Sequence, residues 1–143
     1  MDSLSNWRYS TVTTQTTTDA GQGTPILTSG DAPKLVIQLS QFNGTNTTAV
    51  NMKYFIAALS AVTPDTSGQY DITGTDFFPL GFMNADSSTV ANEPMEPLCV
   101  QPFGAKGSGG SNGFMMPPNS ILIAAPGINQ NGSIVHQAIS ADL

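Results

Sequence analysis

The stretch GGSNG, residues 109–113, places Ser111 between glycines with the spacing of a hydrolase nucleophile elbow. A nucleophilic serine needs a base and an acid, and the only such partners that follow it in the chain are His136 and Asp142. The elbow also needs a helix directly after the serine, and the two prolines of FMMPPN exclude a helix of useful length there. We therefore interpret residues 104–113 as a surface loop and expect no enzymatic activity.

The same loop lacks the charge that a phosphate site requires. In the P-loop pattern laid on this segment, Gly110 stands where the phosphate-binding lysine belongs, and Lys106 lies at the wrong position. The other cations, Arg8, Lys34 and Lys53, are scattered along the chain, so they form no patch that neutralises a row of phosphates. We expect no nucleotide, no cofactor and no nucleic acid.

Three aspartates in PDTSGQYDITGTD, at positions 65, 71 and 76, offer oxygen ligands of the kind that calcium prefers. They lack the spacing of a calcium loop, and we interpret them as carboxylates that cap turns. The chain has one histidine and one cysteine, Cys99, which excludes a transition-metal cluster and an internal disulfide. We expect no metal site, and we expect Cys99 to be a small buried apolar residue.

Composition indicates the class of fold that positions these residues. Only 10% of the 143 residues are charged, against about 25% in typical domains, and ten carboxylates outnumber four cations. Thr, Ser, Asn, Gly and Pro supply the polarity instead, and they favour strands and turns over helices. No apolar run is long enough for a membrane span, and the start MDSLSNWRYS has no secretion signal, so we expect the protein to be made and assembled without secretion.

The middle of the chain contains clear strand patterns. KLVIQLSQF, residues 34–42, alternates with Leu35, Ile37 and Leu39 on one face, which predicts a strand.

Residues 51–62 carry both helical and strand spacing, and we favour a strand there. The segment TPDTSG, residues 63–68, predicts a turn, and residues 69–78 predict the returning strand.

The C-terminal half alternates between irregular and well-patterned segments. Frequent prolines predict an irregular or edge region from residue 79 to residue 102, with short strand pieces such as LCVQPF. SILIAA, residues 120–125, and SIVHQAIS, residues 133–140, predict a hairpin around the Asn131-Gly132 turn, with His136 as a half-buried strand residue. Short strands between turns predict a mainly β domain, a single antiparallel β-sandwich or jelly roll, with an irregular barrel as the alternative.

The polar segment before the first apolar strand predicts an extended N-terminal arm over residues 1–24, followed by a β domain over residues 25–143. Exposed aromatic residues and methionines beside loops are typical of contact surfaces. The residues that we expect to bind partners are Trp7, Arg8, Tyr9 and Val12 in the arm, and Lys106, Phe114, Met115 and Met116 in and after the glycine-rich loop.

The arm NWRYSTVTTQTTTDAGQGTP, the compact β domain and the loops NEPMEPLCVQPFG and GAKGSGGSNG together resemble the small decoration or cement proteins of tailed bacteriophage capsids. This resemblance lies in the character of the whole chain. It implies a homotrimer of β-barrel or jelly-roll subunits on the outside of the virion shell, where capsomers meet. The implied partners are copies of the chain itself and the major capsid protein, which the arm clamps against internal pressure.

Two other interpretations stay open at this point. One is a different structural part of a virion, such as a small jelly-roll capsid subunit or a tail or fibre component. The other is a carbohydrate-binding β-sandwich, for which Trp7, Tyr9, Tyr54 and Tyr70 are the candidate platforms for sugar rings.

Overall fold

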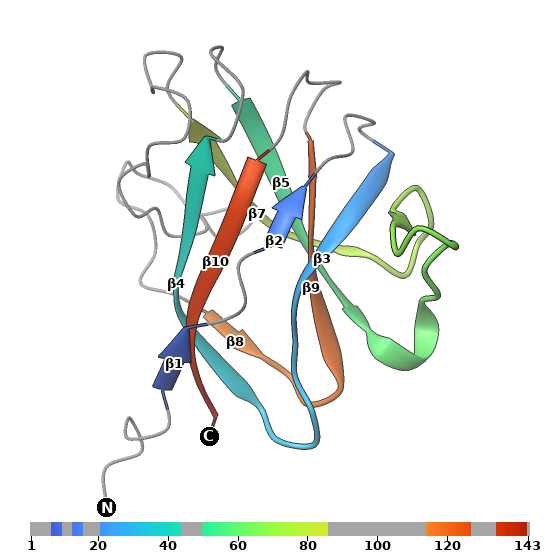
Figure 1. Cartoon of the computed structure of the whole chain (residues 1–143). Coiled ribbons are helices and arrows are strands. Elements are labelled where there is room, and N and C mark those ends of the chain that lie inside the picture. Colours follow the sequence, from blue (N-terminus) through green and yellow to red (C-terminus); the bar gives the residue numbers. More distant parts are fainter. Residues whose placement is uncertain are drawn as a thin grey trace, which may run out of the picture.

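Two antiparallel sheets make up the described part of the chain (Figure 1). The structure, a computed structural model, describes the backbone of residues 7–9, 13–15, 21–43, 50–85, 114–126 and 134–142. The first sheet has the order β1-β10-β4-β8, and β2 pairs with β10 beside β1. The second sheet has the order β6-β3-β9-β5-β7. The prediction of a mainly β, antiparallel sandwich is confirmed.

The strands of the two sheets have the following bounds. The first sheet contains β1 Trp7–Tyr9, β2 Thr13–Gln15, β4 Lys34–Asn43, β8 Phe114–Met116 and β10 Ile134–Asp142. The second sheet contains β3 Gln22–Thr28, β5 Val50–Ala58, β6 Tyr70–Asp71, β7 Phe78–Ala85 and β9 Ser120–Pro126. A single turn of 3-10 helix, η2 Leu59–Ala61, follows β5.

The pairing pattern is that of a jelly roll, in which a long antiparallel ribbon is rolled into two sheets. The nested ribbon pairs are β1 and β2 with β10, β3 with β9, β4 with β8, and β5 with β7. Successive pairs fall in alternate sheets, and the lateral pairs β4·β10 and β5·β9 join them. This arrangement is the two-sheet, eight-strand architecture of jelly-roll domains, with β6 added beside β3.

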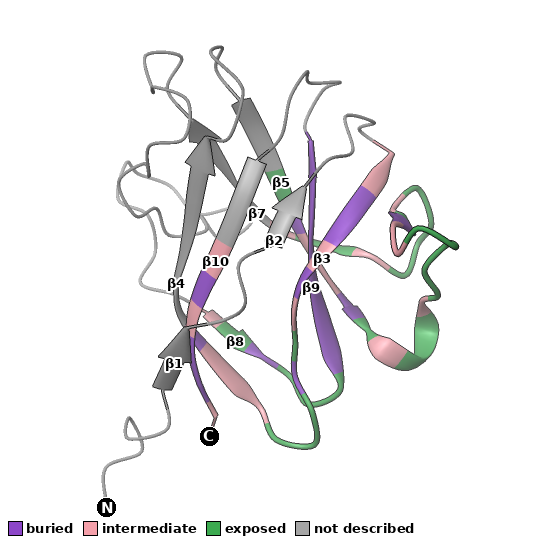
Figure 2. Ribbon diagram, viewed as in Figure 1, coloured by how far each residue is buried: buried purple, intermediate pink, exposed green. Residues whose placement is uncertain are grey.

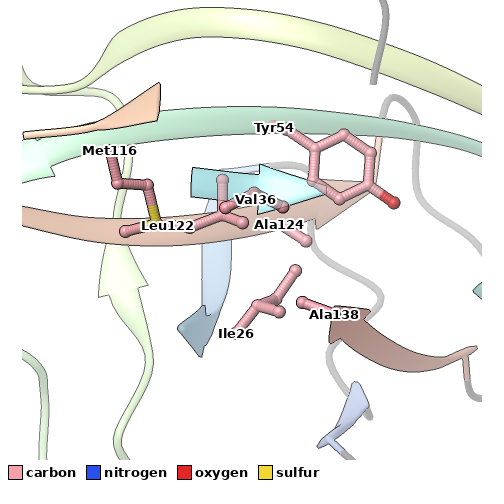
Figure 3. Close-up of a cluster of buried hydrophobic side chains, with 7 residues drawn as sticks. All are labelled: Ile26, Val36, Tyr54, Met116, Leu122, Ala124 and Ala138. Atoms are coloured by element: carbon pink, nitrogen blue, oxygen red, sulfur yellow. The ribbon is translucent and has the colours of Figure 1, made fainter. Parts of the chain in front are cut away.

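The main core lies between the two sheets (Figure 3). Its buried members are Ile26, Val36, Tyr54, Met116, Leu122, Ala124 and Ala138, which come from both sheets. Burial strips water from the Tyr54 hydroxyl and raises its pKa well above the usual value of 10.0.

A second core covers the outer face of the second sheet. Ile121 and Ile123, which alternate along β9 with Leu122 and Ala124, pack there with Ala57 and Tyr70. The chain between β5 and β7 covers them, through Leu59, Val62, Ile72 and Phe77. Figure 2 shows the segment between β5 and β7 mostly as exposed and half-buried turns, and it shows β9 as a buried strand. Both faces of β9 are therefore covered, which explains why SILIAA is a continuous apolar run and not an alternating one.

The strand predicted over residues 34–42 is confirmed as β4, but its predicted alternation is wrong. Val36 is fully buried between the sheets, whereas its neighbour Leu35 is half-buried on the opposite face. The register of β4 and β10 skips Ile37, which makes that residue a β-bulge. A bulge reverses the side on which alternate residues lie, so a count of apolar residues along the strand cannot reveal the core face.

The strands predicted at residues 51–62 and 120–125 are confirmed as β5 and β9, with η2 ending the former. The prediction of a strand over residues 69–78 that pairs back with the preceding strand is wrong. Within this range the structure has only β6, which has two residues and pairs with β3, whereas β7 is the strand that pairs with β5. The predicted C-terminal hairpin is also wrong. β9 lies in the second sheet and β10 in the first, so the two strands are joined across the sandwich.

The N-terminal arm is extended, as predicted, where the structure describes it. Both β1 and β2 pair with the same edge of β10; three residues separate them, whereas two separate their partners Ile139 and His136. β1 and β2 therefore lie along the same edge of the first sheet. The expected boundary at residue 24 falls inside β3.

Candidate interaction surface

Four residues from four neighbouring strands form a row across the first sheet, which we call the outer row. Trp7 of β1 lies opposite Ala141 of β10, Ala141 lies opposite Leu35 of β4, and Leu35 lies opposite Met115 of β8. Directly opposed residues of antiparallel strands share a face, so all four positions belong to one side of the sheet. Strands lie about 4.8 Å apart, so the outer row is roughly 14 Å long.

The outer row faces away from the core. Val36 and Met116, which follow Leu35 and Met115 in the chain, are fully buried in the core between the sheets. Successive side chains of a strand point to opposite faces, so Leu35 and Met115 lie on the outer side. Met115 is 52% exposed, which makes it one of the two most exposed large apolar side chains in the described part of the chain.

The rest of this outer face is uncharged. Tyr9 lies opposite Ile139, which is half-buried and next to Ala138 of the core. The remaining outward positions, by the same register, are Thr14, Val135, Gln137, Gln38, Ser40 and Phe42. No acidic or basic residue stands at any of these positions, although the chain has a net charge of −6. A sheet face without charge has little to bind an ionic ligand and is suited to contact with another uncharged protein surface.

The structure brings part of the predicted partner-binding set together and separates the rest. Trp7 and Tyr9 occupy outward positions of the first sheet, on the same face as Met115, while Arg8 lies opposite Ser140 on the alternate face. The prediction for Met116 is corrected, because its side chain is fully buried in the chain's own core. Phe114 is half-buried and also packs against that core.

Val12 and Lys106 lie outside the described residues, as do Ser111 and Cys99.

A second exposed apolar residue lies on the other sheet. Phe78 is 61% exposed at the start of β7, which forms the edge of the second sheet. It lies opposite Ile56, a residue that packs against the main core. Phe78 therefore stands on the core-facing side of an edge strand, at a place where the described part of the first sheet does not cover it.

Asp65 and Asp71 cap turns, as predicted. Oδ1 of Asp65 accepts hydrogen bonds from the Ser67 amide at 2.8 Å, the Ser67 hydroxyl at 2.7 Å and the Gln69 amide at 3.0 Å. Oδ1 of Asp71 accepts from the Thr73 amide at 3.0 Å and hydroxyl at 2.6 Å. The side-chain bond from Ser67 is the largest cause that lowers the pKa of Asp65, and the bond from Thr73 lowers that of Asp71.

These turns border a polar hollow of about 450 Å³, lined by Thr63, Asp65, Gln69, Asp71 and Thr73 among others. In the described part of the chain, no three His, Cys, Asp or Glu side chains gather into a group that holds a metal ion. The hydrogen bonds within the turns account for the positions of both carboxylates without a ligand.

Two buried serines join the ends of three strands, and we call them, with the carbonyl that they share, the serine cluster. The Ser29 hydroxyl accepts a hydrogen bond from the Ser120 amide at 3.0 Å and lies 3.1 Å from the Ser120 hydroxyl. Both hydroxyls donate to the Pro117 carbonyl. Asn119, whose positive φ of 56° shapes the turn, accepts a bond from the Leu59 amide through its carbonyl. These bonds tie the ends of β3, β8 and β9 together.

Leu35, Ile139 and Ala141 were not predicted from the sequence as members of this surface. Ala141, at an outward position of β10, is 1% exposed. Only the register of the four strands assembles the outer row. No local pattern in the sequence would have identified it.

Comparison with family models, curated proteins and solved structures finds no match to this chain. Among the described residues, no helix is long and apolar enough to span a bilayer.

Proposed function

We propose that this chain is a structural subunit of a virus particle, a decoration protein that binds the outside of a capsid shell and stabilises it. One observation carries the proposal: the jelly roll presents two separate apolar contact points, Met115 on the first sheet and Phe78 on the second. A cementing subunit needs two such surfaces, because it must contact its own copies and also the shell. Exposed apolar patches on soluble domains commonly mark protein contacts.

The charge of the chain supports a position on the exterior. The described carboxylates of Asp31, Asp65, Asp71 and Asp76 are exposed, and the four cations of the whole chain form no cluster in the sequence. A surface that faces a packaged genome would be expected to carry many cations to neutralise phosphates. An acidic, weakly charged surface suits contact with solvent outside the shell.

The arm gives a physical means of clamping. β1 and β2 pair with the edge of β10 through three residues each, so arm and sheet are compatible partners for backbone pairing. Addition of a strand to a sheet edge is a common mode of protein recognition. In an oligomer, several copies of the shell contact multiply the affinity by avidity.

The structure weakens the carbohydrate-binding interpretation. Tyr54 is fully buried and Tyr70 is 8% exposed, so neither ring is available as a platform for a sugar. A tail, fibre or jelly-roll capsid component stays as the alternative within the same class.

Immunogold electron microscopy distinguishes a position on the outside of the shell from a position in the tail or inside the particle. An antibody against the recombinant chain is applied to intact and to disrupted particles of the virus that carries this sequence. Dense labelling over the intact shell is the expected result. Labelling confined to the tail, or found only after disruption, would overturn the proposal.

Attachment to the shell tests the role of Phe78. Particles depleted of the chain are incubated with recombinant protein and then separated by centrifugation. Phe78→Asp places a charge at a contact that is 61% exposed, and we expect it to reduce the bound fraction at least tenfold. Removal of residues 1–20, which spares β3, should also reduce the bound fraction and the temperature at which the shell breaks. Equal binding by wild type and both variants would contradict the proposed contacts.

A further inference from the structure

The chain treats the outer faces of its two sheets differently. It covers the outer face of the second sheet itself, where the segment from Leu59 to Phe77 buries Ile121 and Ile123 of β9. The buried clusters of the described residues include no element packed on the outer face of the first sheet, where Met115 is 52% exposed, Leu35 is half-buried and Ala141 is 1% exposed. The same sheet architecture thus has one face closed by its own chain and one that offers an apolar row.

The lack of charge on the outer face of the first sheet limits the kind of partner that can bind there. Every outward position that the register assigns to the first sheet is uncharged, from Trp7 at one edge to Met115 at the other. A basic partner would find no carboxylate there, and Asp142, the acidic residue at the end of β10, forms an ion pair with Lys34 at 3.2 Å. Two copies that each carry a net charge of −6 repel one another over most of their surfaces. A neutral face is where that repulsion is weakest.

The shape and size of the face also fit a second copy. Sheets pack face to face about 10 Å apart, and a patch that meets a copy of itself satisfies the symmetry of a closed oligomer. β4 and β10 have ten and nine residues, whereas β1, β2 and β8 have three each. At about 3.4 Å of rise per residue and 4.8 Å between strands, each copy contributes roughly 460 Å² of footprint. Two copies together reach about 900 Å², which is the size of a weak, transient contact.

We propose that the outer face of the first sheet, centred on Trp7, Ala141, Leu35 and Met115, is the contact between copies of this chain. This inference rests on the proposed function, because a shell protein that works as an oligomer needs a contact between its own copies. Phe78 and the edge of β7 stay free for the shell. Buried area alone does not set an affinity, so self-association is measured over a range of protein concentrations.

Sedimentation velocity of the full chain, from 1 to 100 µM, tests this contact without any shell present. The wild type should pass from monomer to oligomer within this range of concentration. Met115→Asp should raise the dissociation constant at least tenfold, and Met115→Gln, which adds no charge, should raise it less. Far-UV circular dichroism and thermal melts confirm that each variant is folded.

Phe78→Asp is the matched control, because it introduces the same charge at another exposed apolar residue, on the other sheet. It should leave self-association unchanged while it weakens attachment to the shell. If the wild type stays monomeric at 100 µM, the inference is overturned, because the face then does not join copies of this chain. Equal loss of association in both aspartate variants also overturns it. Self-association through Met115 by a protein that does not label particles would refute the proposed function alone.

Discussion

Replacement of Ser29 by alanine tests the serine cluster most directly. The Ser29 hydroxyl accepts the Ser120 amide at 3.0 Å, and both residues are buried. In Ser29→Ala, that amide loses its acceptor, and a buried unsatisfied donor costs about 1–3 kcal/mol. The Pro117 carbonyl keeps one donor, because the Ser120 hydroxyl lies 2.8 Å from it.

Ser120→Ala has a different consequence, although the chemical change is the same. The backbone amide of residue 120 remains and still donates to Ser29, and the Pro117 carbonyl still accepts from the Ser29 hydroxyl. Each buried group therefore keeps a partner, and the expected loss is about 0.5–1.5 kcal/mol. Ser29→Ala should thus destabilise the protein more than Ser120→Ala, by about 1 kcal/mol.

Urea unfolding followed by circular dichroism, at one protein concentration, measures both losses. At about 2–4 °C per kcal/mol for a chain of this size, thermal melting should show a drop of roughly 2–12 °C for Ser29→Ala. Ser60→Ala, at an exposed position of η2, is the control and should change stability by less than about 0.5 kcal/mol. Equal losses at positions 29 and 120, or a larger loss at 120, would refute the assigned direction of these hydrogen bonds.

Three further outcomes are expected. Gly23→Ala should lower the free energy of unfolding in urea by about 1–3 kcal/mol, because the new methyl group would overlap the buried side chain of Ile123. An unchanged free energy of unfolding would contradict this packing. Folding lowers the pKa of Asp65 below 3.8, so its stabilisation is present above that pH and is lost as the pH falls through the lower folded value. The amide shifts of its turn should therefore titrate in NMR spectra only below about pH 4, and Asp65→Asn should abolish this titration. Met116→Ala, at a fully buried side chain, should cost about 2–5 kcal/mol, whereas Met115→Ala should change the stability of the monomer by less than about 0.5 kcal/mol.

The sequence revealed most of the individual strands, because local patterns reflect local structure. The alternation of KLVIQLSQF and the apolar run SILIAA appear as β4 and β9, and the turn around Asp65 is capped as its residue types indicate. The low charge and the Thr-rich arm also indicated extended, antiparallel structure. These properties depend on residues that are near one another in the chain.

Pairing between distant strands could not be obtained in this way. The Asn131-Gly132 dipeptide indicated a hairpin, yet β9 and β10 belong to opposite sheets. β9 pairs with β3 and β5, and β10 pairs with β4 and with the two strands of the arm. The bulge at Ile37 changes which residues of β4 face the core, and it exists only in the register with β10.

By itself, the sequence determined the class of fold, the main strands, the capped turns and the lack of a local motif for catalysis, because side-chain type and short spacing control these features. Only the tertiary structure decided that Trp7, Ala141, Leu35 and Met115 share one uncharged face, since they come from four strands and from both ends of the chain. It also separated Met115 from its neighbour Met116, which lies in the core. A surface of this kind is set by strand register, and register depends on burial across the whole sandwich.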